Sequence, residues 1–272
     1  MLAAVRARGA EPAITAVAHG TPVVGLDGDD LERFFSRDGV RKLSARDIAP
    51  AVATRADGAT TVAASLALAH AAHIAVLATG GLGGVHRTPP ESGHSADAVR
   101  DESADLAELA RTPMLVVCAG AKTILDLPAT MERLESLGVA VMGYRVDELP
   151  GFLTGGTGIS LSWRFENAVE VAAAWRVQQA LARTQAMVVV QSAPSPLPRA
   201  MVDDAVNRAL DAAARAGIAG AALTPWLLAQ LEKETGGASL ATNVALLESN
   251  AALAAEIAAE VARDVEIGRA HA

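Results

Sequence analysis

The sequence predicts an α/β protein with three layers, α/β/α, in which helices cover both faces of a central mixed sheet in a single domain. Apolar runs of strand length alternate with helix-like segments along all 272 residues, which is the pattern of α/β folds. The chain is 51% hydrophobic but only 3% aromatic, so Ala, Val and Leu must fill a core in which helices pack closely on a sheet. No linker or internal repeat divides the chain, and residues 1–272 are expected to form one domain.

The individual elements follow from local signals. Apolar runs predict strands at 11–17, 23–26, 74–79, in the run 114–122, at 139–144 and at 186–191. Helical patterns predict helices at 1–8, from 29 onward, and at 44–52, 61–72, 104–110, 128–137, 167–183, 200–216, 224–235 and 239–263. Acidic residues in the first turn support the helix that begins at Asp29, and an S-x-x-D capping pattern at 44–47 supports the next one. Polar or Gly-rich stretches predict loops at 88–102 and 151–158, and residues 123–126 are expected to open a helix.

The bulk composition excludes several classes of function. The net charge is −8 and the pI is about 5.3, which argues against a nucleic-acid surface. Basic residues form no block that would suit an anionic membrane, and no apolar stretch approaches the length of a membrane span. The single cysteine, Cys118, rules out an internal disulfide and fits a reducing compartment. No signal peptide is visible, so the expected location is the cytoplasm.

Lysine is scarce in this chain, which has three lysines and twenty arginines. One of the three, Lys122, ends the run 114–122, at the mouth of a predicted sheet where open α/β folds hold their ligands. A partly buried lysine can lose its proton and attack a carbonyl carbon, whereas arginine stays charged. The pattern therefore indicates amine chemistry at Lys122; the alternative is a surface lysine in an arginine-biased chain.

Two further clusters could carry chemistry. Four glycines at 80–84 precede His86 and could let backbone N–H groups approach an anionic ligand, although a tight turn is the alternative. Their spacing matches neither a P-loop nor the dinucleotide fingerprint. Asp101 and Asp105 lie four residues apart, on one side of a predicted helix start, where carboxylates suit a hard divalent ion. Simple capping of that helix by Ser103 is the other interpretation.

Several motifs, in order and at compatible spacing, resemble one enzyme family. They are GATTVAA at 58–64, ATGGLGGVHR at 78–87, SADLAEL at 103–109, VCAGAKTILD at 117–126, TPWLL at 224–228 and GGASL at 236–240 before Asn243 and Asn250. Over nearly the whole chain they resemble the pseudouridine-5′-phosphate glycosidase family, related to the indigoidine-cluster protein IndA. That family cleaves the C–C glycosidic bond of pseudouridine 5′-phosphate to uracil and ribose 5-phosphate.

The resemblance implies a role for each matching position. Lys122 matches the lysine that forms a covalent adduct with ring-opened ribose, and Asp101 matches the aspartate that holds Mn²⁺ through a largely water-filled shell. The positions that match substrate contacts are Lys42, Val62, Thr79, His86, Ser103, Ala104, Asp105 and Asn243. The resemblance also suggests a homotrimer.

The chemistry of a C-glycoside fits those roles. Such a bond has no leaving oxygen to protonate, so the usual pair of carboxylates fails. An iminium at the ribose C1 serves as an electron sink that lets the carbon–carbon bond break, and a general acid must protonate the uracil carbon.

The chain departs from the family pattern at several points. The family's N-terminal strand carries a glutamate, the proposed general acid, in an A-L-E-S-T-type motif, and residues 1–272 contain no such motif, so the family's first strand is expected to be missing. The loop 88–102 is longer than usual, and Asp97 is an alternative to Asp105 in its register. Glu102 stands where the family has an apolar residue beside Asp101. Two other functions therefore stay open: a non-catalytic sugar-phosphate-binding paralogue, and a Schiff-base aldolase acting on a sugar phosphate.

Overall fold

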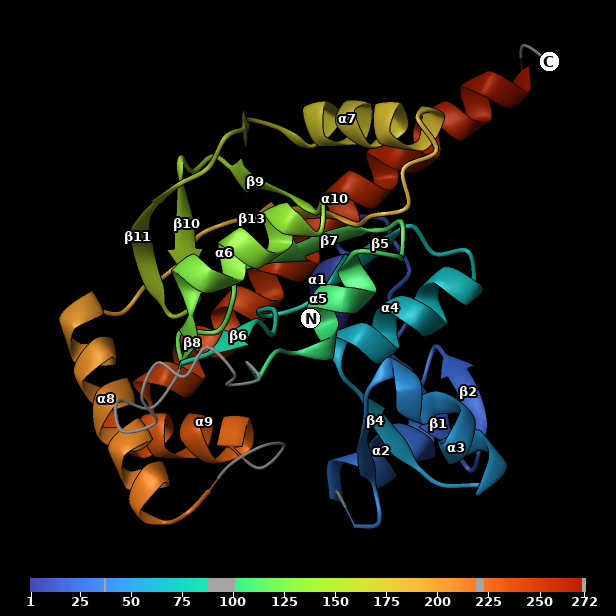
Figure 1. The fold of residues 1–272 in the computed structure, drawn as a ribbon. Coiled ribbons are helices and arrows are strands. Elements are labelled where there is room, and N and C mark those ends of the chain that lie inside the picture. Colours follow the sequence, from blue (N-terminus) through green and yellow to red (C-terminus); the bar gives the residue numbers. More distant parts are fainter. Residues whose placement is uncertain (37, 88–100, 219–222, 271–272) are drawn as a thin grey trace.

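The computed structural model describes residues 1–36, 38–87, 101–218 and 223–270, with no side-chain detail from 264 onward (Figure 1). Its centre is a five-stranded sheet whose described pairings are all parallel. The strand order is β12 (Arg164–Phe165), β9 (Ala140–Tyr144), β13 (Met187–Val190), β7 (Leu115–Cys118) and β5 (Val76–Ala78). Because parallel strands end at the same edge, the carboxyl ends of β5, β7 and β13 lie together.

Alternation along β7 divides the core between the two faces of this sheet. Val116 and Cys118 face one layer of helices, whereas Leu115 and Val117 face the other, and all four are fully buried. The first layer consists of α4 (Val62–Ala71), α5 (Ala104–Leu109) and α6 (Leu127–Ser136), and the second of α7 (Ala168–Ala180) and α10 (Ala238–Ala270). The predicted three-layer α/β fold is confirmed.

The mixed pairing that was expected in the central sheet lies instead in a second, four-stranded sheet. Its order is β2 (Thr21–Val24), β1 (Thr15–Ala18), β4 (Gly58–Thr60) and β3 (Arg41–Leu43), and β3 and β4 are parallel while the other pairs are antiparallel. Helices α2 (Gly28–Ser36) and α3 (Ile48–Ala53) and the 3-10 turn η1 (Ala45–Asp47) accompany it. The N–H of Ser44 donates to Asp47 Oδ2 at 2.9 Å, as the S-x-x-D pattern predicts.

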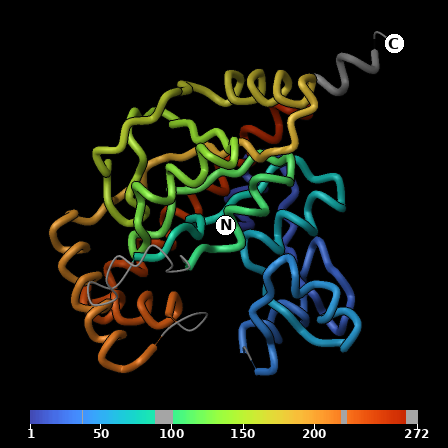
Figure 2. Tube along the Cα trace, viewed as in Figure 1, coloured from blue at the N-terminus to red at the C-terminus, as the bar shows by residue number. Residues whose placement is uncertain are grey.

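Helices α8 (Arg199–Arg215) and α9 (Leu223–Glu234) pack on each other beyond the sheet edge. Figure 2 shows them, in orange, on the opposite side of the molecule from the blue N-terminal sheet. The short helix α1 (Leu2–Arg6) packs against α10. None of the described helices combines the length and the hydropathy that crossing a membrane requires.

Two local predictions are wrong. The stretch 151–158, predicted as a loop, belongs to an antiparallel pair, β10 (Glu148–Gly151) and β11 (Thr154–Ser160). Residues 123–126 do not open a helix, because Leu125 and Asp126 form strand β8, which pairs with β6 (Val85–His86), and α6 begins only at Leu127. The side chain of Asp126 caps that helix by accepting from the Ala129 N–H at 3.0 Å.

Candidate active site

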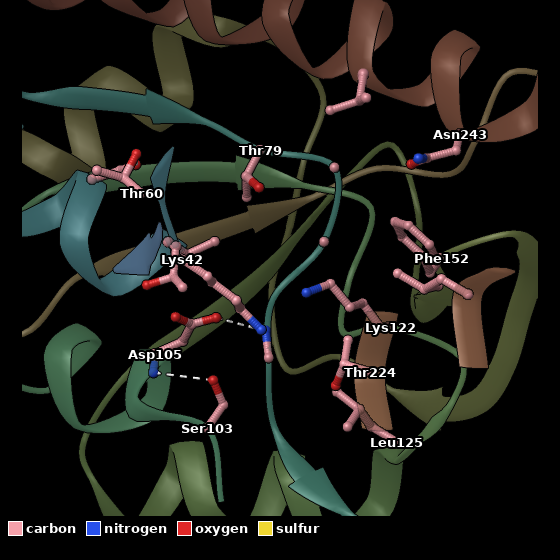
Figure 3. Close-up of a pocket in the computed structure, with 18 of the residues that line it drawn as sticks. Lys42, Thr60, Thr79, Ser103, Asp105, Lys122, Leu125, Phe152, Thr224 and Asn243 are labelled. Carbon is pink, nitrogen blue, oxygen red and sulfur yellow. Dashed lines mark hydrogen bonds between the residues drawn. The ribbon is translucent and has the colours of Figure 1, made fainter. Parts of the chain in front are cut away.

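A cavity of about 430 Å³ lies at the carboxyl ends of β5 and β7. Of the residues predicted from the sequence, it is lined by Lys42, Val62, Thr79, His86, Ser103, Asp105, Lys122 and Asn243. They lie on strands β3 and β6, on or next to helices α4, α5 and α10, and just after the central strands β5 and β7, so the fold gathers residues spread over two hundred positions. In Figure 3 the Lys122 amine points toward the side of the cavity that holds Lys42 and Asp105, and Phe152 and Asn243 stand on the other side.

Backbone hydrogen bonds hold the glycine segment 80–84 against the turn that carries Lys122. The N–H of Ala119 donates to Gly80 O at 2.9 Å, that of Leu82 to Gly120 O at 3.0 Å, and that of Lys122 to Leu82 O at 3.1 Å. These bonds continue the parallel pairing of β5 and β7 past the end of both strands. The position of Lys122 is therefore fixed by the glycine segment itself.

Glycine is required in this segment because the backbone is crowded. A Cβ on Gly83 would come within 2.2 Å of Ser103 Oγ and 2.8 Å of Asp105 Oδ2, and one on Gly81 within 2.7 Å of the Phe152 ring. Gly120 also has a φ of +89°, which L side chains rarely adopt. The segment thus serves close approach to its neighbours, in addition to any approach to a ligand.

The Lys122 amine is half-buried, and its burial lowers its pKa. The negative charge of Asp105 opposes this effect, while the positive charge of Lys42 adds to it. A lowered pKa increases the neutral fraction of the amine, the form that attacks a carbonyl carbon. The cavity can therefore support the amine chemistry predicted for Lys122.

Asp105 is 4% exposed and binds two backbone amides. Its Oδ1 accepts from the Ala63 N–H and its Oδ2 from the Gly83 N–H, both at 2.9 Å. Ser103 caps α5, since its Oγ accepts from the Asp105 N–H at 3.2 Å (Figure 3). The carboxylate thus joins the start of α4 to the glycine segment on the Lys122 side of the cavity.

Asp101 does not share a helix face with Asp105, contrary to the sequence-based expectation. Asp101 precedes the capped start of α5, and its side chain is exposed, whereas Asp105 is buried within the helix. The Asp101 carbonyl accepts from the His86 N–H at 2.9 Å, so Asp101 lies beside a lining residue without lining the cavity itself. Ala104 does not line it either, and Asp97 lies outside the described residues.

Possible metal ligands are sparse in the part of the chain that the structure describes. No three His, Cys, Asp or Glu side chains there are grouped closely enough to hold a metal ion. A single exposed carboxylate such as Asp101 fits only an ion that keeps most of its own water, as hard divalent cations do. The donor set is compatible with the hydrated ion that was predicted, not with a closed protein cage.

The sequence-based reasoning missed Phe152. Its ring lines the cavity, its φ is +63°, and it is 4% exposed, with its N–H donated to Ala119 O at 3.0 Å. A left-handed backbone at a bulky residue is uncommon and marks a conformation that the surrounding structure enforces. Phe152 was not considered because the sequence pattern predicted a loop at 151–158. Thr224 and Leu228 of α9 also line the cavity; both belong to the TPWLL motif, for which no role in the site was predicted.

Known proteins are similar to this chain over most of its length. A family model described as indigoidine synthase A like protein matches residues 1–260. The chain belongs to the indigoidine synthase A-like family. It is 57% identical, over 95% of its length and 82% of the relative's, to a pseudouridine-5′-phosphate glycosidase of Gemmatimonas aurantiaca. A pseudouridine-5′-phosphate glycosidase of Chloroflexus aurantiacus is 49% identical over 95% of this chain and 85% of the relative. The predicted family, and its character as a family of enzymes, are confirmed.

Two solved structures share the fold. A crystal structure of the prealnumycin C-glycosynthase AlnA in complex with ribulose 5-phosphate is 36% identical, with a TM-score of 0.87, over 97% of this chain and 86% of that one. An indigoidine synthase A-like protein from Thermotoga maritima is 32% identical, with a TM-score of 0.84, over 94% of this chain and 82% of that one.

Proposed function

We propose that this chain cleaves the C–C glycosidic bond of pseudouridine 5′-phosphate to uracil and ribose 5-phosphate, with Lys122 as the nucleophile. The observation that carries the proposal is the Lys122 amine, which has a lowered pKa and points toward the side of the cavity that holds Asp105 and Lys42 (Figure 3). The names of the relatives indicate the substrate. The ribulose 5-phosphate bound by AlnA supports a sugar-phosphate site.

The proposed steps follow from the chemistry of an amine. Neutral Lys122 attacks C1 of the ribose and displaces the ring oxygen, which takes up a proton. Protonation of the uracil carbon then lets the C–C bond break: its electron pair passes to uracil while the Lys122 nitrogen pair forms a C=N⁺ bond to C1. Water adds to this iminium and releases ribose 5-phosphate and the free amine, so the net reaction consumes one water.

The other cavity residues are proposed to bind and orient the substrate. Lys42 is the second cation in the cavity and suits the phosphate. Thr79, His86 and Asn243 offer polar groups to the sugar and the base. Ser103 and Asp105 are already engaged with the backbone, so their contact with substrate is proposed to use the acceptor capacity that remains.

We also propose that Asp101 holds a hydrated Mn²⁺ at the edge of the site, as the exposed single carboxylate allows. When bound, the ion would supply positive charge toward an anionic substrate. Because the Asp101 side chain is exposed, Asp101→Asn should lower Mn²⁺ binding, measured by electron paramagnetic resonance, and leave thermal stability unchanged. Unaltered Mn²⁺ binding would reject this assignment.

The main proposal is tested by incubating the protein with pseudouridine 5′-phosphate and Mn²⁺ and measuring the release of uracil by chromatography. Borohydride should also trap ribose 5-phosphate on Lys122, which peptide mass spectrometry locates. Lys122→Met should abolish both signals, and Lys233→Arg, on the exposed surface of α9, serves as the matched control. Trapping without uracil release would favour the sugar-phosphate-binding paralogue. Cleavage of deoxyribose 5-phosphate without Mn²⁺ would favour the aldolase.

A further inference from the structure

Asn250 is a buried amide outside the cavity that contacts the glycine segment directly. It lies on α10 and is 1% exposed. Its Nδ2 donates to Thr79 O at 2.8 Å and to Gly80 O at 3.3 Å, and its Oδ1 accepts from Gln191 Nε2 at 3.0 Å. Both the donor and the acceptor of the Asn250 amide therefore have hydrogen-bond partners, as is usual for a buried polar group.

These contacts join the ends of the three central strands. Thr79 and Gly80 follow β5, and Gln191 follows β13 and donates its N–H to Cys118 O of β7 at 3.1 Å. Gly80 O also accepts from the Ala119 N–H at 2.9 Å. One side chain therefore fixes where the glycine segment leaves the sheet.

From this point a short chain of hydrogen bonds leads to Lys122. Beyond Gly80, Leu82 is bonded on both sides: its N–H donates to Gly120 O, and its carbonyl accepts from the Lys122 N–H at 3.1 Å. A shift of the segment at Thr79–Gly80 would therefore move the backbone that carries the nucleophile. No Asn250 atom is needed in the cavity for this effect, and Asn250 is not among the lining residues.

The same helix face also forms part of the cavity wall. Asn243 and Leu247, which line the cavity, lie seven and three residues before Asn250 and so share its side of α10. A Cβ on Gly80 would meet Leu247 at 3.2 Å and Asn243 Oδ1 at 3.4 Å, so this face lies close against the segment. The hydrogen bonds of Asn250 hold this face of α10 in register with the glycine segment.

We propose that Asn250 is a positioning residue: through Thr79 and Gly80 it sets the register of the glycine segment and thereby the placement of Lys122 against the bound sugar. The inference rests on the proposed function for its choice of Lys122 as the nucleophile. The geometry of the hydrogen bonds does not depend on the substrate.

The test uses Asn250→Asp, which keeps the shape but at neutral pH turns a carboxylate toward two carbonyl oxygens. The acceptor for Gln191 is retained. Because a misplacement of about 1 Å can cost about 100-fold in rate, kcat and the rate of borohydride-trapped adduct formation should fall about 10–100-fold, and KM should change less. Lowering the pH should narrow the difference in rate between Asn250→Asp and the wild type at the same pH, since a protonated carboxyl can donate to one carbonyl again.

A matched control separates positioning from stability. Ile257→Ala removes a fully buried side chain two turns further along α10, where the helix packs against α7 and the central sheet instead of the glycine segment. Compared at equal distance below their melting temperatures, Ile257→Ala should keep the wild-type kcat and Asn250→Asp should not. Equal losses of kcat in both variants would overturn the inference.

A second readout does not require the proposed reaction. Formaldehyde and borohydride methylate only the neutral form of the Lys122 amine. Peptide mass spectrometry at a series of pH values therefore gives a midpoint of methylation that follows the pKa of Lys122, which burial lowers. In Asn250→Asp the looser segment admits water, which relieves the burial and moves the methylation midpoint to higher pH, whereas Ile257→Ala leaves it in place. If the wild type releases no uracil but the midpoint still moves, the proposed function fails and the inference stands. An unmoved midpoint overturns the inference.

Discussion

Replacement of Gly83 by alanine tests whether the glycine segment serves the site or only the turn. The new Cβ would lie 2.2 Å from Ser103 Oγ, 2.5 Å from Ser103 Cβ and 2.8 Å from Asp105 Oδ2. These distances are too short for real atoms, so Ser103 and Asp105 must move. Both line the cavity, and the change therefore reaches the site.

The magnitude follows from two contributions. Overpacking costs about 1–3 kcal/mol, and weakening the bond from the Gly83 N–H to the Asp105 carboxylate costs about 1.5–3 kcal/mol. Gly83→Ala should therefore lose about 2.5–6 kcal/mol of the free energy of unfolding. At about 2 °C per kcal/mol for a chain of this size, that is a fall of about 5–12 °C in melting temperature. Since native stability is typically about 5–15 kcal/mol, most molecules should stay folded at 25 °C.

The assay compares melting temperature with the affinity for ribose 5-phosphate measured by calorimetry. In the folded protein the dissociation constant should rise at least about tenfold, or about 1.4 kcal/mol. Gly155→Ala in β11 is the matched control, because its Cβ would meet nothing within 4 Å. A large fall in melting temperature with unchanged affinity would refute the reasoning and leave the segment as a tight turn only.

Three further outcomes are expected. Burial lowers the pKa of Lys122, so the cation destabilises the fold, and Lys122→Met should be more stable than the wild type at pH 7 in denaturant unfolding. The difference in stability should narrow as pH rises from the lowered pKa of folded Lys122 to the pKa of an unfolded lysine, because the unfolded state binds more protons in that range. A constant difference across pH would contradict this. Asp105→Asn leaves one oxygen for the amides of Ala63 and Gly83, which should cost about 1–3 kcal/mol of stability. It also removes the negative charge that raises the Lys122 pKa, so the methylation midpoint of Lys122 should move to lower pH. A move to higher pH would reject this electrostatic effect of Asp105. Burial raises the pKa of Cys118 to about 12, so a disulfide reagent at pH 8 should label it only after unfolding; fast labelling of the native protein would disprove its burial.

Local sequence patterns were enough to predict the layer architecture and most of the helices. Apolar runs such as 186–191 are long enough to predict a buried strand, and the helical pattern at 167–183 predicts the helix that the structure has at Ala168–Ala180. Lys122 was also found from sequence, because a lone lysine after a buried run is chemically conspicuous. These signals can be read from the sequence because residues that are neighbours in the chain produce them.

The assembly of the site, in contrast, depends on contacts between segments that are distant in sequence. Strands β3 and β4 have three residues each, too few for a period to show, yet they bring Lys42 and Thr60 to the cavity. The hairpin at 148–160 is rich in glycine and lacks a strand pattern, so its pairing and the left-handed Phe152 depend on contacts distant in sequence.

The aspartates show the same limit. Spacing placed Asp101 and Asp105 together, but the capped start of α5 separates them, and the partners of Asp105 lie 42 and 22 residues away. Asn250 reaches Thr79 across 171 positions. No local pattern encodes such a contact, because it exists only once packing of α10 on the sheet brings the two segments together.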